Sequence, residues 1–556
     1  LGSVGAEGGT VLTVGAEVER IPAYLFHVKT ASSSKLQSVF FAQGSVLEEI
    51  GEYAFYQCWT MSLFEMPEGV KQIGAQAFLS CSSLAEIELP EGLEIIGQSA
   101  FERCAALTSI VIPETVTSLG ADAFSFCTAL TEIAFNAIAC EDITLPSGFD
   151  AAGNKSAGVT VTIGAKVTAV PQWLFYGSYG VNYENKITSI VFEEGSVCES
   201  IGSEAFAHCV NLRQIVISAS VTSIALSAFN GCYGLESIVV ESGNSVYHSA
   251  GNCLIETATK TLVAGCKNSV IPDDGSVTAI GDSAFKYNYS LTEIVIPDAV
   301  TKIGSSAFYW CHKLTCVTLG SGLNNNSIGS DAFMDCINLY SVINNSSIGL
   351  VPGNENYGRV AQYAKEVVSS QEQSRRTVTA DGLIFFTTDD YDYLIGYVGN
   401  AEHLVLPDQF EGRNYLIGQY VFSDNKTLRS VVIGSGVTSI DAKAFSGCTN
   451  LESVVILGNS MDDLNVDAFR DCVSLKSVVI PASVTRIWQY AFDGCDALGQ
   501  VYYGGTAQQW EAIQFDTYNY DLQSAPRSYY SASDPGTSSG DSFWHFAEDG
   551  VTPILW

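Results

Sequence analysis

The spacing of a few residue types along this chain predicts an α/β solenoid built from coils of about 23 residues. Phenylalanine recurs at that interval, as at Phe55, Phe78, Phe101 and Phe124. Most of these phenylalanines are followed by a cysteine after three residues and by a leucine after three more. A period of about 20 to 29 residues with leucines at short intervals indicates leucine-rich coils, none of which can bury its apolar face alone.

Each coil is predicted to contain a short strand, a turn and a short helical turn. In residues 81–101, the alternation of Ile87 and Leu89 is typical of a strand. Pro90 ends that strand because it has no N–H to donate. Residues 99–101 are expected to begin a helical turn on the side opposite the strand. Stacked coils would therefore form one parallel sheet face, with helical turns across from it.

These residues carry a family resemblance. The segment LTSIVIPETVTSLGADAFSFC, residues 107–127, resembles the BspA-like (Treponema-type) leucine-rich repeats of bacterial surface antigens. The leucine, isoleucine, proline, glycine, phenylalanine and cysteine positions recur together over roughly residues 10–503. The resemblance implies a secreted or cell-surface, non-enzymatic protein that binds host or neighbouring-cell proteins as an adhesin does.

One coil position is occupied by cysteine or asparagine. Eleven of the sixteen cysteines lie there, and asparagine replaces cysteine in two coils. Both side chains are short and form hydrogen bonds, so we expect a buried structural ladder of free thiols and no metal site. The ladder residues are Cys58, Cys81, Cys104, Cys127, Cys209, Cys232, Asn288, Cys311, Cys336, Asn425, Cys448, Cys472 and Cys495.

Two inserts interrupt the repeat and divide the chain into predicted domains. Residues 1–345 are the first repeat array, 346–412 a helix-and-hairpin insert, 413–503 a second arm and 504–556 a cap. We expect the sequence to start in the middle of an array, because residues 12–26 echo 161–175 with little sequence before them. Further coils, and any export signal, are expected upstream of Leu1. The two arms are expected to meet at a bend or packed junction around the insert.

Both inserts are expected to contain β-hairpins. At about 246–272, Leu254-Ile255 and Leu262-Val263 flank a polar turn. A disulfide between Cys253 and Cys266 is left open, because it depends on the hairpin register. In the second insert, apolar residues at helical spacing predict a helix over 357–371, followed by a hairpin over 383–399.

The last segment is predicted to cover the final coil, because a solenoid needs a cap. The apolar residues assigned to this cap are Trp510, Ile513, Phe515, Trp544, Phe546 and Trp556, with 531–541 as a linking loop. By family resemblance, similar endings occur in secreted proteins of gut Firmicutes.

Composition argues against several classes of partner. The 60 acidic and 26 basic residues give a net charge of −34, which repels phosphate backbones and anionic lipid. No run of about 18 to 20 apolar residues is present to span a membrane. We therefore expect neither nucleic-acid binding nor membrane insertion, and we expect a monomer.

The sequence offers little catalytic or metal-binding chemistry. Its six histidines lie in separate coils or segments, and no common hydrolase, phosphate-loop or dinucleotide motif occurs. Asp389, Asp390 and Asp392 could supply oxygen ligands, but a calcium loop also requires a glycine and a distal glutamate. We interpret this segment as a solvated hairpin tip and expect no enzymatic activity and no cofactor.

The strand residues on either side of the inward isoleucine are the candidate ligand-binding surface. One column is polar and partly acidic and the other is rich in valine. An exposed valine column follows either from β-propensity alone or from a protein-binding face. The candidate residues are Ser109, Val111, Gln214, Val216, Ser237, Val239, Glu293, Val295, Val432, Val455 and Val479.

Two alternative functions remain open. The solenoid could be an architectural spacer within a larger surface protein. It could also be a glycan-binding module that uses the aromatic segment containing Trp173, Tyr176, Tyr179 and Tyr183.

Overall fold

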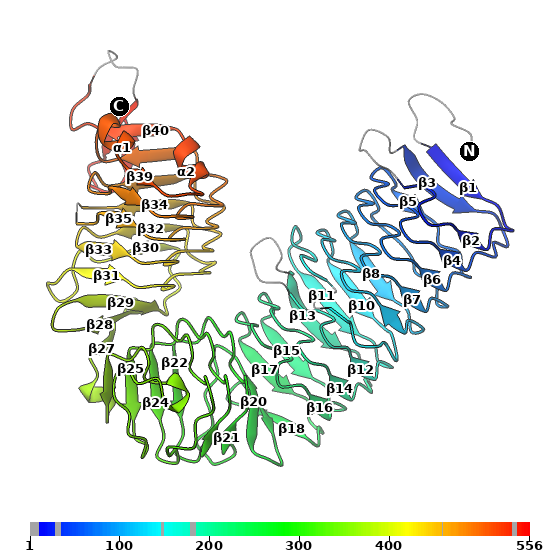
Figure 1. Cartoon of the computed structure of the whole chain (residues 1–556), viewed down its shortest axis with the longest axis horizontal. Helices are drawn as coiled ribbons and strands as arrows, with labels where there is room; N and C mark the ends of the chain where they lie inside the picture. Colours follow the sequence, from blue (N-terminus) through cyan, green and yellow to red (C-terminus); the bar gives the residue numbers. More distant parts are fainter. Residues whose placement is uncertain (1–9, 28–34, 146–148, 178–184, 459, 536–541) are drawn as a thin grey trace.

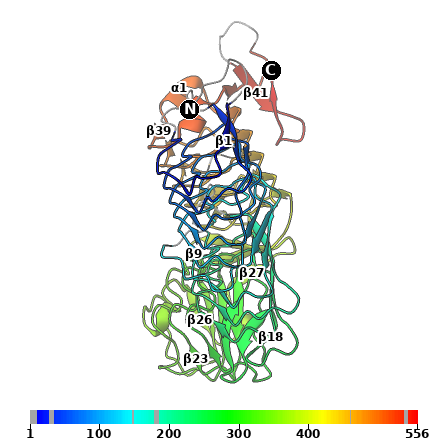
Figure 2. The same ribbon diagram turned by 90° about the vertical axis from the view of Figure 1, so that its right-hand side faces the viewer.

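The computed structural model describes residues 10–27, 35–145, 149–177, 185–458, 460–535 and 542–556. The chain winds as a solenoid with two arms that meet at a bend (Figure 1). Strand β1 and the β41–β42 hairpin lie at the far ends of the two arms. The view turned by 90° shows the arms one behind the other, so the bend lies roughly within one plane (Figure 2).

The longer strand of each coil joins parallel sheets along one side of the solenoid. The pairing is parallel, as predicted, but the strands form several separate sheets and not one continuous sheet. In the longer arm, which we define as β1 to β26, these strands are β1 (Thr10–Val14), β3 (Leu36–Phe41), β5 (Leu63–Phe64), β8 (Ser109–Ile112), β10 (Glu132–Phe135), β11 (Val159–Ile163), β13 (Ile187–Phe192), β15 (Gln214–Ile217), β17 (Ser237–Val240), β22 (Glu293–Ile296), β24 (Cys316–Leu319), β25 (Ser341–Asn344) and β26 (Glu366–Val368).

The shorter arm, β30 to β42, has one eight-stranded sheet along the same side. All of its neighbouring pairs are parallel except the last, in which β41 and β42 are antiparallel. Its strands are β30 (His403–Val405), β32 (Ser430–Ile433), β34 (Ser453–Ile456), β36 (Ser477–Ile480), β38 (Gln500–Tyr503), β40 (Arg527–Tyr530), β41 (Ser542–Phe546) and β42 (Pro553–Leu555).

A second row of strands, mostly of two residues, follows another side of the coils. They are β2 (Arg20–Ile21), β4 (Glu49–Ile50), β6 (Gln72–Ile73), β7 (Ile95–Ile96), β9 (Ser118–Leu119), β12 (Ala169–Val170), β14 (Ser200–Ile201), β16 (Ser223–Ile224), β21 (Ala279–Ile280), β23 (Lys302–Ile303), β31 (Tyr415–Ile417), β33 (Val437–Ile440), β35 (Asp463–Leu464), β37 (Arg486–Ile487) and β39 (Gln514–Phe515).

The predicted helical turns are wrong. Two residues flanking the Ala-Phe motif adopt left-handed backbone angles, as at Ser99 (φ 52°) and Arg103 (φ 61°), and such angles interrupt a right-handed helix. The N–H groups of this segment point instead along the solenoid: that of Phe101 donates to the carbonyl of Ala123 in the next coil at 2.8 Å. The turns of successive coils are thus joined by a backbone ladder. Within the described residues, the α-helices are α1 (Ala507–Glu511) and α2 (Tyr520–Ser524), both in the cap.

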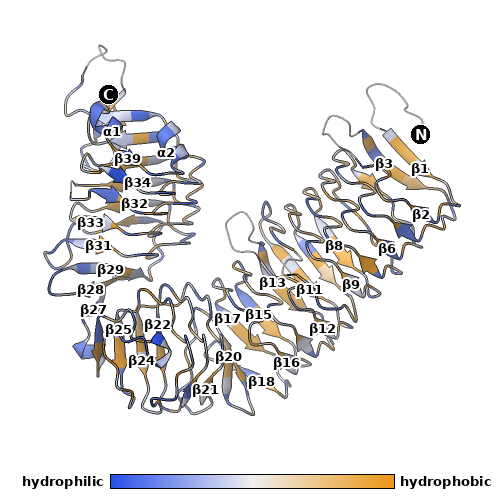
Figure 3. Cartoon of the chain, viewed as in Figure 1, coloured by the Kyte–Doolittle hydropathy of each residue, from blue (hydrophilic) through white to orange (hydrophobic). Residues whose placement is uncertain are grey.

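The phenylalanines stack along the interior of each arm. Phe101 lies between Phe78 and Phe124, with ring centroids 5.1 and 5.3 Å away and nearly parallel planes. All three rings are fully buried. Cys127 is buried, as predicted, and so are Leu130 and Ile133. Figure 3 shows hydrophobic residues recurring coil after coil along both arms.

The ladder cysteines are hydrogen-bond donors to the preceding coil. The thiol of Cys127 donates to the carbonyl of Phe101 at 3.2 Å, and each of the other ten ladder thiols makes the equivalent contact with an upstream phenylalanine at 3.0–3.4 Å. All sixteen cysteines are free, which confirms the prediction of unpaired ladder thiols.

Asparagine replaces cysteine in the two coils that follow hairpins, and it acts differently. Asn288 accepts from the backbone N–H of Ser290 at 3.2 Å, and Asn425 accepts from that of Thr427 at 2.9 Å. In both coils, the residue 26 positions upstream lies in or beside the hairpin and is not a phenylalanine. Where the preceding coil provides no phenylalanine carbonyl at this position, the asparagine side chain instead accepts a hydrogen bond from a backbone N–H of its own loop.

The first insert is a hairpin, as predicted. Strands β18 (Tyr247–Ala250), β19 (Cys253–Glu256) and β20 (Thr261–Gly265) pair antiparallel, and β20 then pairs parallel with β21. No disulfide links Cys253 to Cys266: their thiols donate to the carbonyls of Gly251 and Asn252.

The second insert contains the predicted hairpin but not the predicted helix. Strands β27 (Arg376–Val378), β28 (Leu383–Thr387) and β29 (Asp392–Tyr397) form the hairpin. Residues 357–371 instead include the 3₁₀ turn η2 (Tyr357–Arg359) and strand β26, with a second 3₁₀ turn, η3 (Gln371–Gln373), at their end. Positive φ at Gly358 and Arg359 breaks the helix, and the Gly358 carbonyl accepts from Phe333 in the preceding coil. The apolar residues whose spacing predicted a helix over 357–371 belong instead to one more, irregular coil.

The two arms are packed against each other at the bend. The amine of Lys313 donates to the Ser423 carbonyl at 2.5 Å, and the His312 ring lies 4.2 Å from that of Tyr420. Three apolar cores follow one another, spanning residues 21–266, 253–364 and 383–525. Strands β26 and β30 both lie inside the predicted insert, 346–412, and belong to the sheets of the two arms; the division into domains stays a prediction.

Replacing Phe101 by alanine should destabilise the longer arm by about 3–5 kcal/mol, because it empties one place in a fully buried stack. The denaturant midpoint of the first unfolding transition measures the effect. Ser109→Ala, on the exposed sheet face of the next coil, is the matched control and should change stability by less than about 0.5 kcal/mol. Equal effects of the two changes would contradict the buried stack.

Stability should also fall at alkaline pH. Burial raises the pKa of the Cys104 and Cys232 thiols to about 12, from an ordinary value of 9.0. The folded state therefore holds these protons more tightly than the unfolded state, so stability is complete below about pH 9 and is lost between about pH 9 and 12. The Cys104→Ala/Cys232→Ala variant, although less stable at pH 8, should show a shallower decline in thermal midpoint over that range. An identical slope would refute this assignment.

Candidate functional site

The largest regular exposed surface in the longer arm is the outer face of one six-stranded sheet, β17–β15–β13–β11–β10–β8. The strand register aligns two rows of outward side chains across it. The polar row is Ser109, Glu132, Thr160, Ser189, Gln214 and Ser237. The row that we call the valine row is Val111, Ala134, Thr162, Val191, Val216 and Val239.

Three valines of the valine row are well exposed. Val111, Val191 and Val239 are 52, 46 and 36% accessible, whereas the alternating inward isoleucines are buried. Six strands spaced about 4.8 Å apart make the row roughly 24 Å long. A row of this length can contact an extended segment or a flat surface of another protein.

Val191 was missed by the sequence prediction. Its coil departs from the repeat: no cysteine follows Phe175 after three residues, and the Asn185 amide donates to the Phe175 carbonyl at 3.2 Å. The signal was present in the alternation of Ile190, Val191 and Phe192, which places Val191 outward.

The candidate residues Glu293 and Val295 lie on a different sheet, β22–β24–β25–β26. Val295 is 59% exposed, but the row does not continue across this sheet. The insert covers the neighbouring outward positions. Arg376 donates to Thr315 at 3.0 Å and to Glu293 at 2.9 Å, and Cys316, which pairs with Glu293 in the sheet, is buried.

In the shorter arm, two predicted surface valines are not exposed. Val455 and Val479 are 9 and 2% accessible, and Val432 is half-buried. The C-terminal strand β41 folds its own aromatic side chains over them, and Trp544 is 1% exposed. Correcting the prediction, this valine column is an internal interface and not a free surface.

Trp544 is fixed by both packing and hydrogen bonding. Its indole N–H donates to the Tyr503 carbonyl at 2.9 Å, and its ring lies edge-on to Tyr502 and Phe546 at 5.6 and 4.8 Å. A recess of about 180 Å³ remains beside it. Of the other predicted cap residues, Trp510 and Ile513 are buried in the core and Phe515 packs against it, whereas Trp556 is exposed. Within the predicted linking loop, 536–541 lie outside the described residues.

Replacing Trp544 by alanine should uncover the shorter-arm valines. We expect a clear rise in the fluorescence of a hydrophobic dye and a loss of stability of about 3–5 kcal/mol. Trp556→Ala is the control, because that side chain is 47% exposed and does not cover Val455 or Val479. Dye binding unchanged from wild type in the folded Trp544 variant would contradict the covering role.

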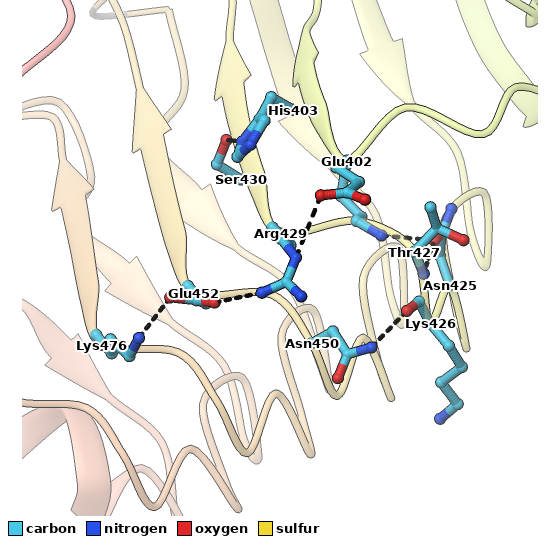
Figure 4. Close-up of polar contacts among 11 residues, drawn as sticks. Glu402, His403, Asn425, Lys426, Thr427, Arg429, Ser430, Asn450, Glu452 and Lys476 are labelled. Carbon is cyan, nitrogen blue, oxygen red and sulfur yellow. Dashed lines mark hydrogen bonds and ion pairs between the residues drawn. The ribbon is translucent and has the colours of Figure 1, made fainter.

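Polar side chains at the start of the shorter-arm strands form a line of alternating charge (Figure 4). Arg429 lies between Glu402 and Glu452, at 3.3 and 2.8 Å, and Lys476 pairs with Glu452. His403 and Ser430 are hydrogen-bonded at 2.8 Å. Such exposed pairs contribute at most about 1 kcal/mol each. Their charges compensate one another, so this line is not a strong site for a charged ligand.

The structure does not assemble the other candidate sites. The Trp173 indole is hydrogen-bonded to Glu204 and Tyr176 packs edge-on against His208, while Tyr179 and Tyr183 lie outside the described residues. Among the residues that the structure describes, no group of three or more histidine, cysteine, aspartate or glutamate side chains is placed to hold a metal. None of the helices in the same part of the chain is long and apolar enough to cross a membrane.

The aspartates of the second hairpin do not share one environment. Asp389 is exposed, but Asp392 is almost completely buried and lies 3.4 Å from Arg413. Burial raises the pKa of Asp392, and the nearby Arg413 opposes that rise. The interpretation of all three as a solvated tip is therefore wrong for Asp392, which is part of the hairpin packing.

Comparisons with known proteins match the repeats. A family model described as a BspA type leucine-rich repeat region, with six copies, matches residues 48–182, 177–264, 260–354 and 400–523. No curated protein matches the chain.

Several solved structures have similar folds. A leucine-rich cell surface protein of Faecalibacterium prausnitzii is 20% identical over 92% of both chains, with a TM-score of 0.33. The pneumococcal vaccine antigen PcpA is 15% identical over 81% of this chain and 84% of its own, with a TM-score of 0.29. A leucine-rich repeat protein of Bacteroides ovatus is 20% identical, over 93% of this chain and 92% of its own, with a TM-score of 0.27. TM-scores below 0.5 do not establish a shared overall shape.

Proposed function

Because this chain belongs to the BspA-type leucine-rich repeat proteins, we propose that it is a non-enzymatic binding protein that engages another protein through the valine row. The proposal includes an extracellular or cell-surface location and a host or neighbouring-cell partner, which the resemblance to bacterial surface antigens supports. The protein acts as a monomeric adhesin-like scaffold in this proposal.

One observation carries the proposal: the chain covers one valine column and leaves another open. In the shorter arm, Trp544 shields Val455 and Val479. In the longer arm, Val111, Val191 and Val239 are exposed at equivalent outward positions. Exposed apolar side chains gathered on one face often mark an interaction site. A partner covering the longer-arm row would have the same role as Trp544 in the shorter arm, whereas an architectural spacer would not require an exposed row.

The flanking polar row supports binding specificity. Ser109, Gln214 and Ser237 offer hydrogen-bond donors and acceptors beside the valines, and Glu132 adds negative charge. An apolar row beside a polar rim is a common arrangement in protein interfaces. The partner surface is therefore expected to carry an apolar ridge with basic or hydrogen-bonding side chains beside it.

The test is to replace Val216 and Val239 by lysine. A panel of purified host extracellular proteins is first screened by surface plasmon resonance against the full chain. For any protein that binds, the double variant should lose about tenfold or more in affinity, roughly 1.4 kcal/mol, if these residues are near the interface centre. Folding should remain intact, because both residues are at outward strand positions.

A matched double variant adds the same two charges elsewhere. Val270 and Val405 are 71 and 67% exposed and lie outside the valine row, so Val270→Lys/Val405→Lys should bind as wild type does. Unchanged affinity of the Val216/Val239 variant, or an equal loss in the control, would remove the valine row from the proposed interface.

A further inference from the structure

A cleft of about 430 Å³ lies where the two arms meet, and its lining contains no residue of the valine row. One wall comes from longer-arm turns between Val210 and Lys313, and the other from 397–399 at the end of the hairpin and from 424–427. The Lys313–Ser423 and Asn338–Gln419 hydrogen bonds, at 2.5 and 2.7 Å, hold the two sides together. Its volume is within the range of ligand pockets, about 300–1,000 Å³.

The cleft is unusually basic for this protein. Arg213, Lys267, Lys313 and Lys426 all line it, although the chain has only 26 basic residues and a net charge of −34. Asp424 is the one acidic residue among the lining. The lining of the cleft is therefore mainly basic, whereas the chain as a whole is acidic.

The ion pairs around the cleft leave an excess of positive charge. Arg213 and Lys267 share a single carboxylate, Glu236, at 3.0 and 2.7 Å. Lys426 lies 3.7 Å from Asp424, and Figure 4 shows its side chain directed away from the alternating line of charge. Burial lowers the pKa of Lys313, and its amine already donates to the Ser423 carbonyl. The other three cations, Arg213, Lys267 and Lys426, face the two carboxylates of Glu236 and Asp424. This surplus of positive charge favours an anionic ligand.

The remaining lining favours a polyhydroxylated ligand. Asn211, Asn268, Ser290 and Thr427 contribute amide and hydroxyl groups, and Tyr233 contributes an aromatic ring. Amides and hydroxyls both donate and accept hydrogen bonds, as sugar hydroxyls do.

The backbone of the cleft is already used by the solenoid, which argues against a peptide strand. The Arg213 carbonyl accepts from Glu236 at 2.8 Å, and the Lys267 N–H donates to Leu235 at 3.2 Å. The Thr427 N–H donates to the Asn425 side chain. Peptides that add to a sheet require a free strand edge, and these turns do not offer one.

We infer that this cleft binds an acidic saccharide. A carboxylate or sulfate group would lie between the cations of the two walls, and the sugar hydroxyls would contact the asparagine, serine and threonine side chains. Uronic acid and sulfated sugars share this chemistry. Because the site is separate from the valine row, it goes beyond the proposed protein-binding function.

The test is isothermal titration of the full chain with digalacturonate, a sulfated heparin disaccharide, neutral lactose and a tetraglutamate peptide. At least one acidic saccharide should bind about tenfold or more tightly than lactose, and its affinity should fall as salt increases. Digalacturonate and the heparin disaccharide distinguish a carboxylate ligand from a sulfate ligand.

Arg213→Gln/Lys426→Gln should lower that affinity by about tenfold or more, because charged hydrogen bonds are lost. Lys166→Gln is the matched control: this exposed lysine pairs with Glu114 at 2.9 Å, far from the cleft. Circular dichroism and the thermal midpoint establish that the variants fold; should the double variant fail to fold, the single Arg213→Gln change, at a side chain 61% exposed, provides the same test. The Val216→Lys/Val239→Lys variant should keep saccharide binding, which separates this site from the proposed protein interface.

Three results would overturn the inference: no acidic saccharide binds, lactose binds as tightly, or tetraglutamate binds more tightly than either acidic saccharide. An acidic saccharide whose affinity is the same for wild type and a folded Arg213→Gln/Lys426→Gln variant would also overturn it, because binding would then lie elsewhere.

Discussion

The backbone ladder between successive turns is the constraint on which the rest of this solenoid depends. Left-handed residues on both sides of the Ala-Phe motif, such as Ser99 and Arg103, turn alternate N–H groups toward the next coil. That geometry fixes the coil spacing, which in turn stacks Phe78, Phe101 and Phe124 at 5.1–5.3 Å. A short donor is then needed to reach the phenylalanine carbonyl, and the buried thiols provide it.

Outward valines such as Val479 are covered in the shorter arm, whereas outward valines such as Val239 are exposed in the longer arm. The shorter arm is closed by its own C-terminal strand, whose Trp544 covers Val455 and Val479. The longer arm has no equivalent cover among the described residues over Val111, Val191 and Val239. This difference cannot come from β-propensity, because both arms place valine outward in similar strands. It depends on which surfaces the chain itself occupies.

The bend creates a chemical environment that neither arm has alone. Along the shorter arm, the charges of Glu402, Arg429, Glu452 and Lys476 alternate and compensate. At the bend, turns from both arms place more basic than acidic side chains around one cleft, although the whole chain is strongly acidic. Packing of the arms thus gathers positive charge in one cleft of a protein whose net charge is negative.

The repeating features could be predicted from the sequence alone: the coil length, the parallel strand pairing, and the buried phenylalanine and cysteine positions. Both hairpins could be predicted as well. Each of these features depends on residue spacing within a short segment, and the stacked coils repeat the same spacing. The sequence prediction was wrong where one residue pattern fits two structures. The Ala-Phe turns are not helical, because Ser99 and Arg103 have positive φ. Residues 357–371 were predicted to be a helix but form one more irregular coil of the solenoid.

Which outward side chains stay exposed, and which charged side chains lie together, became clear only from the folded chain. Val479 and Val239 occupy similar outward strand positions, yet only the first is covered, by a tryptophan 65 residues further along the chain. Arg213 and Lys426 are likewise distant in sequence and line one cleft because the arms fold together. Burial and charge clustering depend on contacts between distant segments, and repeat spacing carries no information about those contacts.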